Sequence, residues 1–102
     1  MPRGEGADSS PTYKVFETQQ FLRDLERLGH ARQAQLESKL RAYVYPLLRK
    51  EPYIGPNIKR LKDWDPPTWR YRIGDWRFFY ELDARKRIIF MVASKHRREA
   101  YR

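Results

Sequence analysis

The chain reads Trp69-Arg70-Tyr71-Arg72-Ile73-Gly74-Asp75-Trp76-Arg77-Phe78-Phe79-Tyr80-Glu81-Leu82 from position 69 to 82, and this run is the clearest guide to its fold. Gly74-Asp75 between two strand-like runs is a strong signal for a two-residue hairpin turn. In that hairpin Arg72 opposes Arg77, and strand alternation places Arg70 on the same face. The other face, which is therefore suited to receive helices, carries most apolar side chains of the run, namely Trp69, Tyr71, Ile73, Trp76, Phe78, Tyr80 and Leu82.

The three arginines of the predicted hairpin would crowd one small patch. Like charges that face each other across strands are destabilising, so we expect an external polyanion to neutralise them. Relief by Glu81, by Asp75 or by water is the structural alternative. Thirteen of the 22 Lys and Arg lie within residues 57–102 against six acids, so this part carries +7 of the net +9. A basic, aromatic-rich sheet surface is typical of a nucleic-acid binder.

Length and composition bound the remaining possibilities. A chain of 102 residues has room for one core, and we expect a disordered tail over residues 1–11 and one domain over residues 12–102. With no Cys and two His, a disulfide framework, a metal site and a cofactor are not expected. The chain has no apolar run of membrane-spanning length and no signal-peptide pattern, which favours a cytoplasmic protein.

The segment before the hairpin predicts one strand and two helices. Residues 13–17 alternate as a short strand, and Thr18 is a suitable N-cap for a helix that ends at Gly29. A second helix should begin at His30 or Ala31 and break or kink at Pro46. The first helix is expected to bury Phe21, Leu22, Leu25 and Leu28, and the second Leu36, Leu40, Tyr43, Val44 and Leu47.

Four segments predict strands, namely residues 58–62, 69–73, 76–82 and 87–94. The continuous apolar run over residues 88–93 is typical of a central strand that is covered on both faces. The expected architecture is α+β: an N-terminal strand and two helices packed on one face of a mostly antiparallel sheet. The basic face of the sheet is left for a ligand.

The order of these elements resembles the RelE/ParE superfamily of type II toxin–antitoxin toxins, and the likeness covers about residues 13–102. The stretches that carry it, besides the hairpin, are Glu51-Pro52-Tyr53-Ile54-Gly55-Pro56, Ile58-Lys59-Arg60-Leu61-Lys62 and His96-Arg97-Arg98-Glu99-Ala100-Tyr101-Arg102. The resemblance implies the small RelE-like fold and a microbial toxin.

The resemblance leaves the activity open between branches of the superfamily. The RelE branch cleaves messenger RNA in the ribosomal A site, whereas the ParE branch inhibits DNA gyrase without cutting nucleic acid. The first is favoured, because Arg72 and Arg77 occur together with the tail from His96 to Tyr101. We therefore expect a metal-independent endoribonuclease that inhibits translation. The alternatives are a gyrase inhibitor and an inactive homologue that only binds its antitoxin.

The resemblance places the site on the hairpin and the C-terminal tail. Cleavage of RNA by its own 2′-OH needs a base, an acid and stabilisation of the phosphorane, and arginines supply only the last. Arg77 and Arg97 are assigned that role, and a base or acid is expected from His96, Tyr101 or Glu81. The expected RNA-backbone contacts are Lys59, Lys62, Arg70, Arg72, Lys95 and Arg98.

Two features qualify this assignment. Well-studied RelE members have lysines where this chain has Arg70 and Arg72, and an arginine does not give up its proton. Lys59 and Lys62 are equally well explained as lysines that protect an edge strand from pairing.

The expected partners are the ribosome, messenger RNA and an acidic antitoxin. The antitoxin segment should be disordered when free and should wrap the toxin with a helix or an added strand. Its acidic residues are expected near Arg70, Arg72 or Arg77.

Overall fold

The computed structural model describes residues 12–100 of the 102. In chain order its elements are β2 (Lys14–Glu17), α1 (Gln19–Glu26), α2 (His30–Lys39), the π-helical segment η1 (Leu40–Val44), α3 (Tyr45–Lys50), β3 (Ile58–Arg60), β4 (Thr68–Ile73), β5 (Trp76–Asp83) and β6 (Ile88–His96). The tail that the sequence predicts over residues 1–11 lies outside the described residues.

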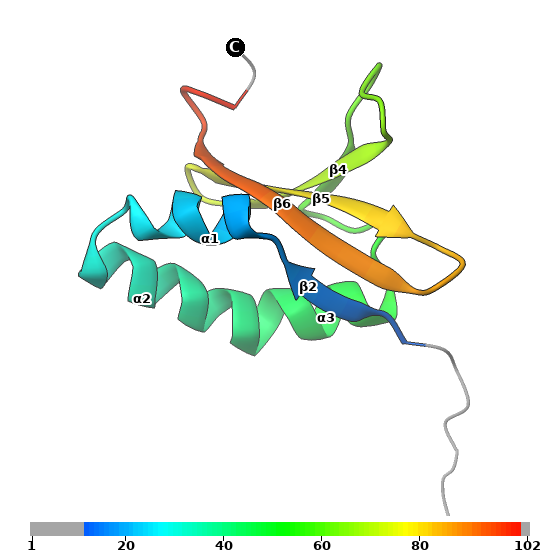
Figure 1. Ribbon diagram of the computed structural model, residues 1–102, viewed down its shortest axis with the longest axis horizontal. Helices are drawn as coiled ribbons and strands as arrows, with labels where there is room; N and C mark the ends of the chain where they lie inside the picture. The colour runs from blue at the N-terminus through cyan, green and yellow to red at the C-terminus, as the bar shows by residue number, and fades with distance from the viewer. Residues whose placement is uncertain (1–11, 101–102) are drawn as a thin grey trace, which may run out of the picture.

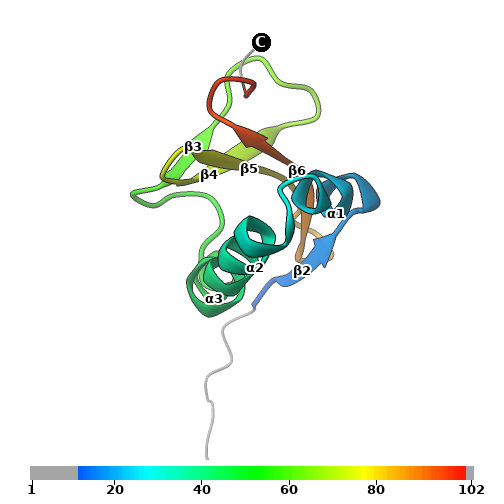
Figure 2. The ribbon, with the colours of Figure 1, turned by 90° about the vertical axis from the view of Figure 1, so that its left-hand side faces the viewer.

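The five strands form one mixed sheet in the order β2-β6-β5-β4-β3. β2 runs parallel to β6, and the other neighbouring strands are antiparallel. The helices lie on one side of this sheet, and the chain returns after α3 to form β3 at the far edge (Figures 1 and 2). The predicted α+β fold is confirmed, and so is the central place of the apolar run, since β6 lies between β2 and β5.

Two predicted strands end two residues away from the expected position. β3 ends at Arg60 instead of residue 62, and β6 continues to His96 instead of ending at residue 94. The second difference matters for the site, because a residue within a strand has its side-chain direction set by alternation.

The first helix has the predicted cap, but it ends at Glu26 with Arg27 as its C-cap, earlier than the predicted stop at Gly29. The Thr18 hydroxyl accepts a hydrogen bond from the Phe21 N–H at 3.3 Å. Gly29 has φ of 83°, a backbone conformation that glycine adopts without steric cost, and α2 starts directly after it. Leu22 is an exception to the predicted apolar face, because 39% of it is exposed.

The second helical region passes Pro46 without the expected break. At η1 the Tyr45 N–H donates to the Leu40 carbonyl, five residues earlier, and Tyr45 keeps helical dihedral angles. Helical dihedral angles continue from Lys39 through Tyr45 into α3, so Pro46 lies inside a continuous helix that lacks its backbone N–H. The irregularity takes the form of a π-helical turn immediately before the proline.

This π-helical turn changes which side chains are buried. The buried stripe consists of Leu36, Leu40, Val44 and Leu48, whereas Tyr43 is 71% and Leu47 is 45% exposed, so the burial predicted for these two was wrong. A four-residue spacing drifts by about 40° per step around an α-helix. The wider turn of η1 offsets part of that drift and keeps the stripe on the sheet.

The main core lies between the helices and the sheet. Its largest fully buried side chains include Phe21, Leu25, Phe78 and Tyr80. The Tyr80 hydroxyl donates to the Pro52 carbonyl at 2.7 Å, and burial raises the pKa of Tyr80. The tyrosine is therefore a stable donor that ties the loop after α3 to the middle of the sheet.

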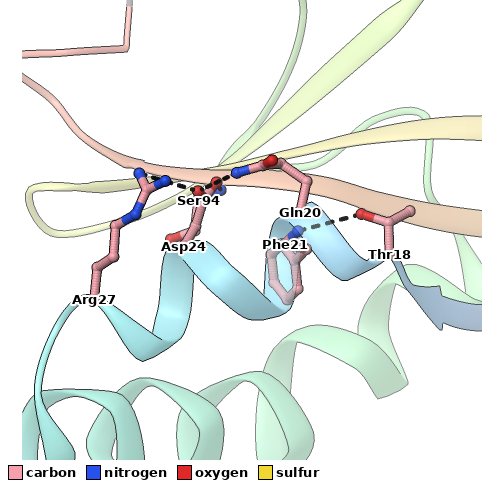
Figure 3. A network of polar contacts seen from close by, with 6 residues as sticks. All are labelled: Thr18, Gln20, Phe21, Asp24, Arg27 and Ser94. Carbon is pink, nitrogen blue, oxygen red and sulfur yellow. Dashed lines mark hydrogen bonds and ion pairs between the residues drawn. The ribbon is translucent and has the colours of Figure 1, made fainter.

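A buried carboxylate joins α1 to β6 beyond the end of β2. Asp24, whose side chain is 5% exposed, accepts hydrogen bonds from the Ser94 N–H and from Gln20, both at 2.9 Å (Figure 3). Arg27 lies 3.7 Å from the same carboxylate. β2 pairs with β6 only as far as Met91, so beyond that point α1 supplies the acceptor that a strand would otherwise provide.

We expect Asp24→Ala to lower the free energy of unfolding by about 2 kcal/mol, because the buried Ser94 N–H loses its acceptor. Ser94→Ala is the control: it keeps the N–H and removes a buried hydroxyl that has no partner within residues 12–100. It should cost much less. Urea unfolding of both variants measures the difference, and equal losses would show that packing, and not this hydrogen bond, anchors α1.

Candidate nucleic-acid interface

The face of the sheet opposite the helices carries basic side chains in register. Arg72 pairs with Arg77, and Arg77 pairs with Lys95, so three neighbouring strands place cations in one row. In the next row Lys59 pairs with Arg70 and Arg70 with Phe79. We call the five residues Lys59, Arg70, Arg72, Arg77 and Lys95 the basic face. The opposition of Arg72 and Arg77 predicted from the sequence is confirmed.

The β4–β5 turn holds Arg77 in place. One terminal nitrogen of its guanidinium donates to the carbonyl of Gly74 at 2.8 Å and to that of Trp76 at 3.1 Å. A guanidinium has five N–H donors, so these two bonds orient the group while its fork retains donors for a phosphate. The turn itself relies on Gly74, whose φ is 55°.

The same turn holds the segment that follows β6. The Arg97 N–H donates to the Asp75 carbonyl at 2.7 Å, and Arg97 Nε lies 3.5 Å from Asp75 Oδ1. Both side chains are more than half exposed, so this ion pair contributes little to stability. Arg97 therefore lies at the hairpin turn, beside the basic face, with a partner that a phosphate can replace.

His96 lies on the opposite face from the arginines. It pairs in register with Trp76, and the two rings meet edge to face with centroids 5.2 Å apart. Its Nδ1 accepts a hydrogen bond from the Arg98 N–H at 3.2 Å. The structure therefore does not bring His96 together with Arg77, and the reason is that β6 extends far enough for alternation to give Lys95, and not His96, the arginine side.

The remaining predicted residues lie at the margins. Lys62 follows β3, Arg98 follows β6, and both are exposed. Tyr101 lies outside the described residues. Glu81 shares the arginine side of β5, but it pairs with Thr68 at the end away from the turn.

Part of the arginine side is apolar, a feature that sequence reasoning missed. Leu61, Phe79 and Ala100 form a second small buried cluster, with Val92 and Ala93 packed against it. The face expected to be left entirely for a ligand is thus partly covered by the chain itself. The signal in the sequence was Phe79, an aromatic residue at an arginine-side position of β5.

A groove between the helices and the hairpin is a second surface that the sequence did not reveal. Its main hollow, about 300 Å³, is lined by Lys39, Tyr43, Val44, Asn57, Tyr71, Arg72, Ile73 and Gly74. A smaller hollow shares Asn57 and Tyr71 and adds Leu47 and Ile58. We call this the helix–hairpin groove. Tyr43 and Leu47 are exposed at it because of the π-helical turn described above.

Other kinds of site find no support in the described part of the chain. Within residues 12–100 no three His, Cys, Asp or Glu side chains gather as metal ligands. Over the same range no helix is both long and apolar enough to cross a bilayer.

Residues 15–101 match the family model described as the ParE toxin of type II toxin–antitoxin systems. The chain belongs to this ParE toxin family. No curated protein sequence matches it. The toxin thus has the basic face, the anchored arginine and the helix–hairpin groove on one small fold.

Solved structures show the same fold. The toxin–antitoxin complex RelBE2 of Mycobacterium tuberculosis contains a chain with 24% identity and a TM-score of 0.64, covering 84% of this chain and 99% of that one. A mutant of the Escherichia coli toxin RelE in the free state has 21% identity and a TM-score of 0.61, covering 88% and 87%. The RelE–RelB complex of Pyrococcus horikoshii has 22% identity and a TM-score of 0.58, covering 87% and 99%.

Proposed function

We propose that this toxin inhibits translation in the cytoplasm by cleaving messenger RNA in the ribosomal A site. The observation that carries the proposal is the row Arg72, Arg77 and Lys95, which three adjacent strands hold on one face. Like charges in such a row repel one another, and a bound phosphate backbone removes that repulsion. The fold relatives that include RelE support the same direction.

In the proposed cleavage reaction, the residues of the basic face have different roles. Cleavage by the RNA's own 2′-OH builds negative charge on the phosphorane, and the oriented guanidinium of Arg77 is placed to stabilise it. Lys95, its neighbour in register, carries a proton that it can donate to the leaving 5′-oxygen. Lys59, Lys62, Arg70, Arg72 and Arg98 are proposed to hold the RNA backbone, and Arg97 to add charge beside the turn.

His96 takes a different role in this proposal from the proton transfer that the sequence predicts for it. Its ring packs on Trp76, and its Nδ1 accepts from the Arg98 N–H, so it positions the turn that carries Arg97 and Arg98. Proton transfer by Tyr101 stays a prediction, as does Glu81 as a base.

Inhibition of DNA gyrase without cleavage is the second candidate. Two observations favour it: the matching family model is ParE, and His96 is directed away from the arginines. A basic face that binds without cutting needs no acid or base.

A translation assay in vitro separates the two functions. We expect the purified toxin to stop protein synthesis and to leave new 5′-ends within ribosome-bound message. Gyrase supercoiling should be unaffected at the same concentration. Intact message together with inhibited supercoiling would refute the nuclease proposal and support the gyrase one.

We further propose that an acidic antitoxin neutralises the toxin and that part of it lies in the helix–hairpin groove. Several structural relatives are complexes with RelB partners. The groove offers exposed Tyr43 and Leu47 for apolar side chains, and Lys39 lines it for acidic ones. An antitoxin segment that alternates apolar and acidic residues fits both features.

The double variant Tyr43→Ser with Leu47→Ser tests this docking site. We expect it to remain toxic and to need at least about tenfold more antitoxin for rescue, because it loses two exposed apolar anchors. Phe16→Ser is the control, since Phe16 is also large and 55% exposed but lies on β2. Growth is measured while the neighbouring antitoxin gene is induced in steps. Rescue of the double variant at the wild-type dose would contradict the groove as the docking site.

A further inference from the structure

We propose that Trp64 is a stacking platform for one unpaired base of RNA bound on the basic face. The indole lies almost parallel to the ring of Phe79, with centroids 5.5 Å apart and an interplanar angle of 16°. Phe79 is 1% exposed, whereas Trp64 is 44% exposed. The tryptophan therefore covers Phe79 with one side and presents much of its remaining surface to solvent. This inference rests on the proposed function, because it assumes that RNA is the ligand.

The platform lies among the cations of the basic face. Phe79 pairs with Arg70, which pairs with Lys59, and along β5 it lies two residues from Arg77 on the same side. The ring stacked on Phe79 is thus over the second row of the basic face. Proteins that bind single-stranded nucleic acid combine such a charged track with an aromatic ring on which a base stacks.

The loop that carries Trp64 is tied at its base. The Leu61 N–H donates to the Thr68 carbonyl at 2.9 Å, and the Thr68 hydroxyl donates to the Pro66 carbonyl at 2.9 Å. Pro66 and Pro67 further restrict the backbone of the short connection. A ring that is already held by Phe79 and by this loop loses little conformational freedom when a base stacks on it.

An isolated exposed aromatic residue is common on protein surfaces and by itself indicates no site. Trp64 differs from Tyr43, which is more exposed, because Tyr43 lies on the helical region and Trp64 is stacked over the basic face. The expected ligand is single-stranded RNA of any sequence, since every base has a π-face and stacking does not read its edges.

The test measures binding of the full-length toxin to three fluorescent polyanions by anisotropy. They are a single-stranded RNA with 2′-O-methyl groups, which cannot be cleaved through its 2′-OH, the corresponding RNA duplex, and polyphosphate. We expect Trp64→Leu to bind the single strand at least about tenfold more weakly and the other two unchanged. Trp64→Tyr should keep most of the affinity, because it retains a flat ring. Tyr43→Leu, which changes an exposed aromatic residue on the helix side of the sheet, should bind all three like the wild type.

The possible failures are distinguishable. Wild-type affinity of Trp64→Leu for the single strand would overturn the platform and leave the proposed function standing. An equal loss for all three polyanions would also overturn it, because it would show general damage to the basic face. A lower unfolding temperature of Trp64→Leu would identify that damage. The RNA affinity of Trp64→Tyr, which keeps an aromatic ring in the same loop, is then compared with that of the wild type. A wild-type toxin that binds polyphosphate but neither RNA would overturn the platform and the proposed function together.

Discussion

Arg77→Ala is expected to reduce RNA cleavage by about 100-fold and to abolish growth inhibition. The guanidinium is aimed by the carbonyls of Gly74 and Trp76 and lies between Arg72 and Lys95 in register. Removing one oriented donor that stabilises transition-state charge typically costs a factor of this size. Cleavage is measured on ribosome-bound message, and toxicity is measured by growth after induction.

Two comparisons make this result specific. Arg85→Ala removes an exposed arginine from the β5–β6 turn, and it should leave toxicity unchanged. Arg77→Lys keeps the charge but loses the bidentate fork, so it should show an intermediate loss. Thermal unfolding should be close to wild type in all three, because none of these side chains is in the core. A folded Arg77→Ala protein that remains toxic would remove Arg77 from the site.

Lys95 and His96 are adjacent residues on opposite faces of β6. Replacing each of them in turn is the second test for which we expect a large effect on RNA cleavage. We expect Lys95→Gln to reduce cleavage by about 100-fold, since it removes both a cation and a transferable proton from the side of Arg77. His96→Gln should reduce cleavage much less, because that ring packs on Trp76. Single-turnover cleavage and RNA affinity are measured separately for each variant.

The reverse result is equally informative. A His96→Gln toxin that keeps RNA affinity but loses cleavage, beside an active Lys95→Gln toxin, would assign proton transfer to the histidine. The site would then lie at the end of β6 and not on the basic face. A loss of affinity alone in Lys95→Gln would limit Lys95 to binding the backbone.

Local patterns in the chain were sufficient for the architecture. The Gly74-Asp75 turn, alternation along the hairpin and the Thr18 cap each depend on residues close in sequence, and each is present in the structure. The facing of Arg72 and Arg77 follows from the same short-range geometry. The basic face could therefore be predicted in its central part.

Features that depend on contacts between distant segments could not be read in this way. Pro46 predicted an irregularity in the second helical region, but the exposure of Tyr43 and Leu47 depends on how that region packs on the sheet. The stacking of Trp64 on Phe79 joins a loop to a strand that comes later in the chain. No local sequence pattern predicts these packing arrangements, because the packing partners of a side chain depend on the whole folded core.

The end of β6 shows the division most clearly. The sequence shows that Lys95, His96 and Arg97 are consecutive residues of a basic segment. It does not show which of them faces Arg77. That choice follows from the length of β6 and from its pairing with β5, which puts Lys95 opposite Arg77 and His96 opposite Trp76. The sequence alone therefore determines the residue types, the charge and the hairpin. The face on which each residue near the end of β6 lies depends on strand register, and long-range backbone hydrogen bonds establish that register only in the folded sheet.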